Sequence, residues 1–113
     1  QVKAIREMAD KESCVIVERN ADYILREFDH CLRVFVHADF EWRVDRMHQM
    51  MPDTPVEKLR MTIKSVDRAR NAYCTRSTGH HYPDATNYDL TLCTSRLGID
   101  VALEQILKAA EHI

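Results

Sequence analysis

The stretch CLRVFVHADFEWRVDRMHQMM, from Cys31 to Met51, decides the fold that the sequence predicts. Its first part, CLRVFVHA, is apolar at most positions, as expected of a parallel strand that is buried on both faces. Asp39 then stands at the N-cap position of a helical segment, and Pro52 follows the end of that segment. A buried strand that runs directly into a helix is the repeating unit of α/β folds with parallel sheets.

Strands and helices alternate on both sides of this stretch. The spacing of apolar residues predicts further helices over Val2–Ala9, Pro55–Tyr73 and Leu97–Ile113, and a loop over Cys74–Asn87. Short apolar or alternating runs predict parallel strands near residues 13–17, 31–37 and 89–94. The expected fold is therefore a three-layer α/β domain, a parallel sheet flanked by helices, that occupies residues 1–113 as a single domain.

Charge and cysteine content exclude several classes of function. The chain has 113 residues with 16 Lys and Arg against 18 Asp and Glu, so no broad positive field attracts a nucleic acid polymer or an anionic membrane. No apolar run approaches the roughly 18 residues of a membrane helix. The four cysteines lack metal-ligand spacing, which favours reduced thiols in a cytoplasmic protein over a disulfide framework and predicts no metal site.

Any anion site must therefore be local, and parallel sheets place ligands beyond the carboxyl ends of their strands. Three segments follow the predicted strands: 18–22, 37–39 and 94–96. A fourth candidate is VDRARNAYCTRSTG, Val66 to Gly79, which gathers Arg68, Arg70 and Arg76. These arginines could form an ordinary solvated helix end, or they could hold a polyanion.

Several segments resemble the cytidylate kinase-like family, a branch of the P-loop nucleoside monophosphate kinases. They are VIVERNADYIL, CLRVFVHADFEWRVDRM, VDRARNAY and YDLTLCTSRLGIDVALEQIL, in the order of the family. The resemblance implies that Arg19 faces the acceptor monophosphate, although Glu18 stands where the family usually has glycine. It also implies a lid-like region over about residues 55–87, in which Asp67, Arg68 and Arg70 close over the nucleotide.

The function implied is transfer of the γ-phosphoryl group of ATP, with Mg²⁺, to a nucleoside monophosphate. Arg19 and Asp67 would bind substrate, and Arg68 and Arg70 would neutralise charge on the transferred group. The chain has only two glycines and no GxxxxGK[ST] loop, so it resembles the C-terminal portion of such a kinase, incomplete at the N-terminus. The alternative is a non-catalytic α/β module that binds nucleotides or serves assembly.

The missing loop leaves a gap in the expected sheet. The first two predicted strands then either pair directly, or receive a neighbour from another chain in a homo-oligomer, or are completed by an N-terminal segment that precedes Gln1. An unpaired central strand would otherwise bury backbone amides without partners.

Each site residue also has a simpler interpretation. Arg43 and Arg46 are expected to pair with Glu41 on the helix surface, and Arg60, Lys64 and Arg68 could form one basic stripe. Phe40 and Trp42 could stack on a base or simply pack, and His80 and His81 could bind a metal or do nothing. Because Arg68 and Arg70 point about 200° apart on a helix, both reach one ligand only if the helix ends or bends between Asp67 and Tyr73.

Overall fold

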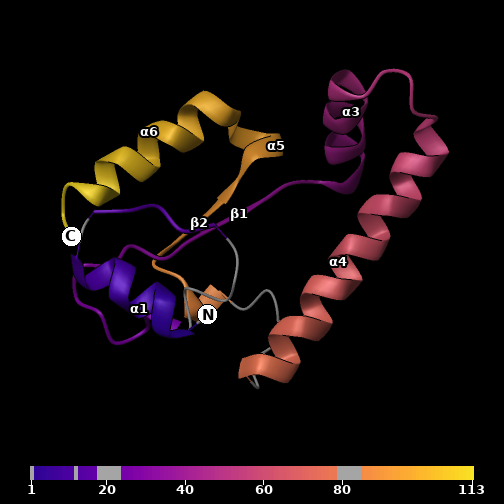
Figure 1. The fold of residues 1–113 in the computed structure, drawn as a ribbon. Coiled ribbons are helices and arrows are strands. Elements are labelled where there is room, and N and C mark those ends of the chain that lie inside the picture. Colours follow the sequence, from indigo (N-terminus) through magenta and orange to yellow (C-terminus); the bar gives the residue numbers. More distant parts are fainter. Residues whose placement is uncertain (1, 12, 18–23, 79–84) are drawn as a thin grey trace.

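Two parallel strands, β1 (Val34–His37) and β2 (Leu90–Cys93), form the sheet in the described part of this computed structural model (Figure 1). The structure describes residues 2–11, 13–17, 24–78 and 85–113, and for 74–78 the backbone alone. The strands pair in register from Val34 with Leu90 to His37 with Cys93. The prediction of parallel strands in these two segments is confirmed, and the structure shows that they pair with each other.

Helices accompany the strands in the described residues, and most of the predicted helices are present. Helix α1 is longer than predicted, the long helix continues through Thr78 where a loop was expected from Cys74, and Ile24 is helical with a turn over residues 25–27. The bounds are α1 Val2–Lys11, α3 Phe40–Met50, α4 Val56–Thr78, the 3-10 helix η1 Ala85–Asn87, α5 Thr94–Leu97 and α6 Ile99–Ala110.

The predicted strand near residues 13–17 is wrong. These residues belong to no helix or strand, and Val15 and Val17 are 92% and 75% exposed. A strand exists only where a neighbour accepts and donates its backbone hydrogen bonds, and in the described residues β1 and β2 pair with each other alone. Of the predicted three-layer α/β domain, the described residues confirm helices together with a small parallel sheet of two strands.

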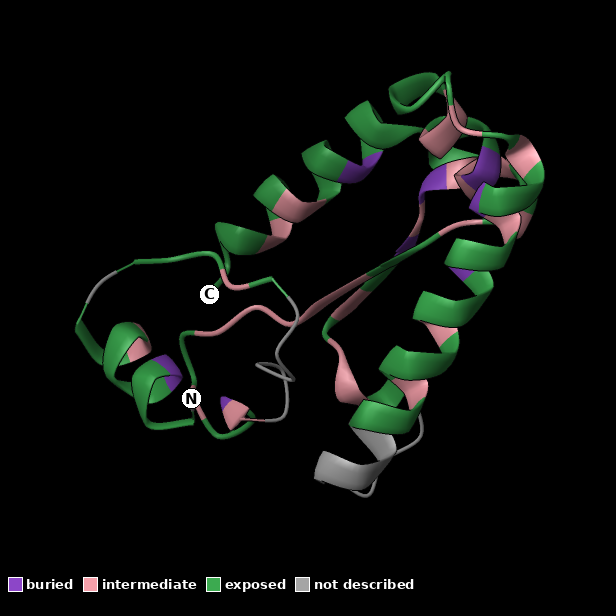
Figure 2. Cartoon of the chain, turned by 45° about the vertical axis from the view of Figure 1, so that its right-hand side comes forward, coloured by how far each residue is buried: buried purple, intermediate pink, exposed green. Residues whose placement is uncertain are grey.

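The strands are also less buried than the sequence predicts. Val36 of β1 is 48% exposed, whereas Leu92 of β2 is 6% exposed beneath the C-terminal helices. Helices α5 and α6 pack against the sheet, and Ala102 of α6 is buried there at 4% exposure. The two strands run between α6 on one side and α4 on the other (Figures 1 and 2).

Helices α3 and α4 form an antiparallel hairpin that follows β1. They pack on each other, and Val44 of α3 and Leu59 and Ile63 of α4 are buried at 1%, 2% and 8% exposure. Asp39 occupies the N-cap position of α3 as predicted, but its side chain makes no capping hydrogen bond. The backbone N–H of Asp39 donates instead to Ser95 of α5, so the start of the hairpin is tied to the end of the sheet.

A separate apolar cluster lies at the N-terminal end of the described chain. Ile5 of α1 and Leu25 are buried together, and Ala9, Ile16, Ile24, Phe28 and Cys31 pack around them. This cluster gives the amphipathic face of α1 its partner. The helix therefore contributes burial even though residues 13–17 after it form no strand.

Candidate functional site

The carboxyl ends of β1 and β2 meet at one edge of the sheet and are joined by side chains. Asp39, after β1, donates its backbone N–H to Ser95 Oγ at 3.0 Å. Thr94, directly after β2, donates its hydroxyl to the carbonyl oxygen of His37 at 3.3 Å. Cys93 Sγ and Ser95 Oγ are hydrogen-bonded at 3.1 Å. Two of the three segments predicted to border a ligand site, 37–39 and 94–96, are thus brought together.

Arg43 connects this edge to the long helix α4. Its Nε donates to the carbonyl oxygen of Ala38 at 3.1 Å, just beyond β1. Its Nη1 lies 3.0 Å from Oδ1 and 2.9 Å from Oδ2 of Asp67 on α4. The interpretation of Arg43 as a surface residue paired with Glu41 is wrong, because the hairpin brings α4 within reach of the first turn of α3.

Glu41 pairs with α4 instead. Its Oε1 lies 2.6 Å from Nη1 of Arg60, which also lies 3.6 Å from Glu57 on its own helix. Lys64 lies over the ring of Phe40 at 5.5 Å from Nζ to centroid. The basic stripe of α4 therefore divides: Arg60 and Lys64 contact α3, and Arg68 lies exposed farther along the helix.

The aromatic side chains of α3 lie against cationic side chains of the same helix. The guanidinium carbon of Arg43 is 5.8 Å from the ring of Phe40, and that of Arg46 is 5.8 Å from the ring of Trp42. Both rings are half-buried. Packing, the simpler of the two interpretations for these aromatics, is the one their contacts favour.

Arg68 and Arg70 lie on an unbroken helix. Helix α4 continues from Val56 to Thr78, so the end or bend between Asp67 and Tyr73 that convergence would require is absent. Both arginines are exposed, and Asp67 between Val66 and Arg68 is half-buried. At 3.6 residues per turn the two arginines leave the helix about 200° apart, so in this conformation they do not converge on one ligand.

A model of the cytidylate kinase-like family matches residues 1–96. This chain belongs to the cytidylate kinase-like family. The matched region contains the sheet edge, the hairpin of α3 and α4, and the arginines of α4. The prediction of family membership is confirmed.

A solved structure has the same fold. It is the crystal structure of an uncharacterized protein from Eubacterium ventriosum, with a TM-score of 0.91, 24% sequence identity and coverage of 99% of this chain. The chain spans 63% of the length of that protein. At this identity the likeness shows the fold alone. No curated protein matches the chain.

Some predicted site residues lie outside the described residues. These are Arg19, the implied acceptor-binding residue, Glu18 beside it, and the histidines His80 and His81. Their roles stay predictions from the sequence. Within the ranges that the structure describes, Cys14, Cys31 and Cys93 form no disulfide, and no cluster of three or more His, Cys, Asp or Glu could hold a metal.

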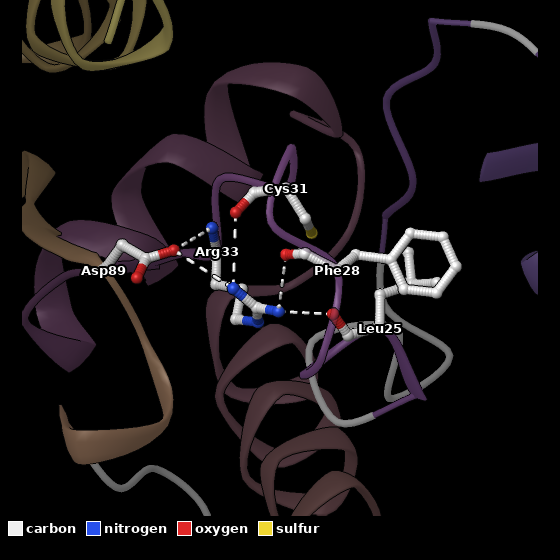
Figure 3. Close-up of polar contacts among 5 residues, drawn as sticks. All are labelled: Leu25, Phe28, Cys31, Arg33 and Asp89. Carbon is white, nitrogen blue, oxygen red and sulfur yellow. Dashed lines mark hydrogen bonds and ion pairs between the residues drawn. The ribbon is translucent and has the colours of Figure 1, made fainter. Parts of the chain in front are cut away.

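Arg33 has a structural role that its sequence context did not predict, because its side chain binds several backbone carbonyl oxygens (Figure 3). Its Nη1 donates to the carbonyl oxygen of Cys31 at 3.3 Å, and its Nη2 donates to those of Leu25 and of Phe28, the latter at 3.3 Å. Its backbone N–H donates to Asp89 Oδ2 at 2.8 Å. An arginine inside the apolar run CLRVFV was the signal that could have revealed it, since a cation there needs buried acceptors.

Arg33 organises the amino edge of the sheet, opposite the candidate site. The carbonyl oxygen of Arg33 accepts hydrogen bonds from the backbone N–H groups of Asp89 and Leu90, so it sets the start of the β1–β2 pairing.

Among the described helices, none has both the length and the apolar character needed to cross a membrane.

Proposed function

We propose that this chain is part of a nucleoside monophosphate kinase that transfers the γ-phosphoryl group of ATP to a cytidylate-like acceptor. The observation that carries the proposal is the family match over residues 1–96. Phosphoryl transfer asks a protein for positioning and for positive charge rather than for a nucleophile. In this proposal the sheet edge positions the substrates, and the arginines of the neighbouring helix α4 supply the positive charge.

In this proposal the region over residues 55–87 acts as a lid, and Arg68 and Arg70 of α4 neutralise charge on the transferred group. Their exposure supports the role, because a guanidinium that is to meet a nucleotide must be accessible. Since α4 is continuous, we propose that one of the two faces the nucleotide in any single orientation of the helix. Arg19 keeps its proposed role of binding the acceptor phosphate.

Asp67 has two proposed roles, to hold an arginine in place or to contact the nucleotide. Its two carboxylate oxygens accept hydrogen bonds from Arg43, which supports the first role. An Asp engaged in this way has less capacity to accept a bond from a ribose or base. The pair instead keeps the lid helix next to the sheet edge.

The family implies ATP and Mg²⁺ as cosubstrate and ion. Mg²⁺ offsets phosphate charge when it is bound to the nucleotide. The residues described by the structure do not form a protein-based metal site, so we assign none of them to the ion.

The experiment is a coupled assay of phosphoryl transfer from ATP to CMP, UMP and AMP, with the chain and any sequence that its gene encodes on either side. Transfer to CMP that disappears without Mg²⁺ is the expected result. Titration calorimetry of the 113-residue chain with CMP and with ATP–Mg²⁺ measures binding separately. Absence of both transfer and binding would overturn the proposal.

The second candidate is a non-catalytic module that binds nucleotides or serves assembly. The observation that favours it is that this chain contains two glycines, Gly79 and Gly98, and no glycine-rich loop with a lysine. Binding of CMP without transfer, in the protein encoded by the whole gene, would select this candidate.

A further inference from the structure

We propose that Arg43 is a positioning residue that sets the rotation of α4 about its axis, and thereby the directions in which Arg68 and Arg70 leave the helix. The inference rests on the proposed function for the meaning of those directions. The contacts themselves do not depend on it.

One side chain joins the sheet edge to the lid helix. Arg43 donates from Nε to Ala38, which follows β1 directly, and from Nη1 to both carboxylate oxygens of Asp67, 24 residues farther along the chain. A guanidinium is planar and rigid, so donating in two directions at once fixes the position of one acceptor relative to the other. A lysine in this place would have one ammonium group and could not hold the same geometry.

The position of Asp67 on α4 makes this contact decisive for the two arginines. With about 100° per residue, Arg68 lies about 100° to one side of Asp67 and Arg70 about 60° to the other side. The two arginines are thus about 160° apart on the side that includes Asp67 and about 200° apart on the opposite side of the helix. Holding Asp67 toward α3 therefore biases at once the directions in which both arginine side chains leave the helix.

Other contacts between the helices fix this rotation less well. Leu59 and Ile63 are buried on α4, but apolar packing tolerates small rotations more readily than a hydrogen-bonded pair does. The Arg60–Glu41 ion pair joins the hairpin about two turns before Asp67. It holds the helices together but lies farther from the two arginines.

Exposure limits how strong the Arg43–Asp67 pair can be. The two side chains are 34% and 40% exposed, so solvent screens much of their attraction. The pair is therefore suited to bias an orientation rather than to stabilise the whole fold. A helix held by a weak, directed contact can turn when a nucleotide competes for the same arginine or aspartate.

The first test is amide hydrogen exchange by NMR, which needs no nucleotide. In Arg43→Ala and Asp67→Asn, the amides of residues 68–73 should exchange about threefold faster than in the parent chain, and the double variant should add little. Asp67→Asn changes a half-buried side chain by one group and so keeps the fold testable if Arg43→Ala does not fold. Arg60→Ala and Arg46→Ala are the controls and should leave these amides unchanged.

The second test separates positioning from structure in the protein that carries out transfer. Arg43→Ala should lower kcat about tenfold while the KM for the acceptor stays within about twofold, and Arg43→Lys should recover only part of the loss. Exchange of residues 68–73 that is equal in Arg43→Ala and Arg60→Ala overturns the inference, whether or not transfer is found. A full recovery by Arg43→Lys also overturns it.

Discussion

Removal of the Arg33 side chain should destabilise the chain more than removal of any arginine on α3. The side chain is 13% exposed, donates to three backbone carbonyl oxygens and lies 3.6 Å from Asp89 Oδ2. Each charged hydrogen bond contributes about 1.5–3 kcal/mol, but the carbonyl oxygens can regain water in part. We therefore expect Arg33→Ala to lower the free energy of unfolding by about 2–4 kcal/mol.

Urea denaturation followed by circular dichroism measures this loss. With a slope of about 1.5 kcal/mol/M, a loss of 3 kcal/mol moves the midpoint down by about 2 M. Asp89 is 45% exposed, so Asp89→Asn should cost only about 0.5–1 kcal/mol. If Arg33→Ala leaves too little folded protein, Arg33→Lys should show an intermediate loss, because lysine keeps the charge but cannot reach all of the carbonyl oxygens.

Arg46→Ala is the matched control. Arg46 is an exposed arginine over the ring of Trp42, and its removal should cost less than about 1 kcal/mol. The reasoning fails if Arg33→Ala and Arg46→Ala lower the midpoint equally, since the buried carbonyl oxygens would then gain nothing from the guanidinium.

Three further outcomes are expected. Arg68→Ala or Arg70→Ala, whichever removes the arginine that faces the nucleotide, should slow phosphoryl transfer by ~10²-fold or more with little change in the urea midpoint, and unchanged rates in both would return these arginines to the solvated surface. Gly98→Ala should cost about 1–2 kcal/mol in thermal or urea unfolding, because Gly98 has φ +82° between α5 and α6, and a neutral effect would contradict the strain argument. The 113-residue chain should self-associate in sedimentation velocity. Its accessible surface of 8480 Å² exceeds the roughly 6,400 Å² expected of a folded monomer of this mass. Apolar side chains contribute to this surface, since Val36 and Leu107 are 48% and 58% exposed. A single monomeric boundary at high micromolar concentration would count against that expectation.

The strongest predictions from the sequence concerned segments whose signals are local. The apolar spacing of Val2–Ala9 and Pro55–Tyr73 corresponds to α1 and α4, and the runs near 31–37 and 89–94 correspond to β1 and β2. Helix periodicity depends on residues three or four apart, which the sequence displays directly. The same pattern could not place the end of α4, because Gly79 and the loop chemistry suggested a stop several residues before Thr78.

The family was also legible in the sequence, and the model that matches residues 1–96 confirms it. The roles of Asp67, Arg68 and Arg70 came from that resemblance, and they stay proposals. The sequence left open whether the helix ends or bends between Asp67 and Tyr73, and the structure shows α4 continuing to Thr78. Whether a helix bends there depends on the packing of neighbours on either side of it, which a single segment does not reveal.

By itself the sequence determined the helices, strands at the positions of β1 and β2, the near-neutral charge and the family. Tertiary structure alone decided which charges meet. Arg43 reaches Asp67 across 24 residues because α3 and α4 fold back on each other, and Arg33 reaches Leu25 and Asp89 because a turn and a second strand converge on it. It also decided that residues 13–17 are no strand, since a strand needs a hydrogen-bonded neighbour and not only apolar residues. Helices and strands repeat over a few residues, so neighbouring residues in the sequence show them. The hydrogen-bond and ion-pair partners of a side chain can be far away in the sequence, so only the folded chain shows them.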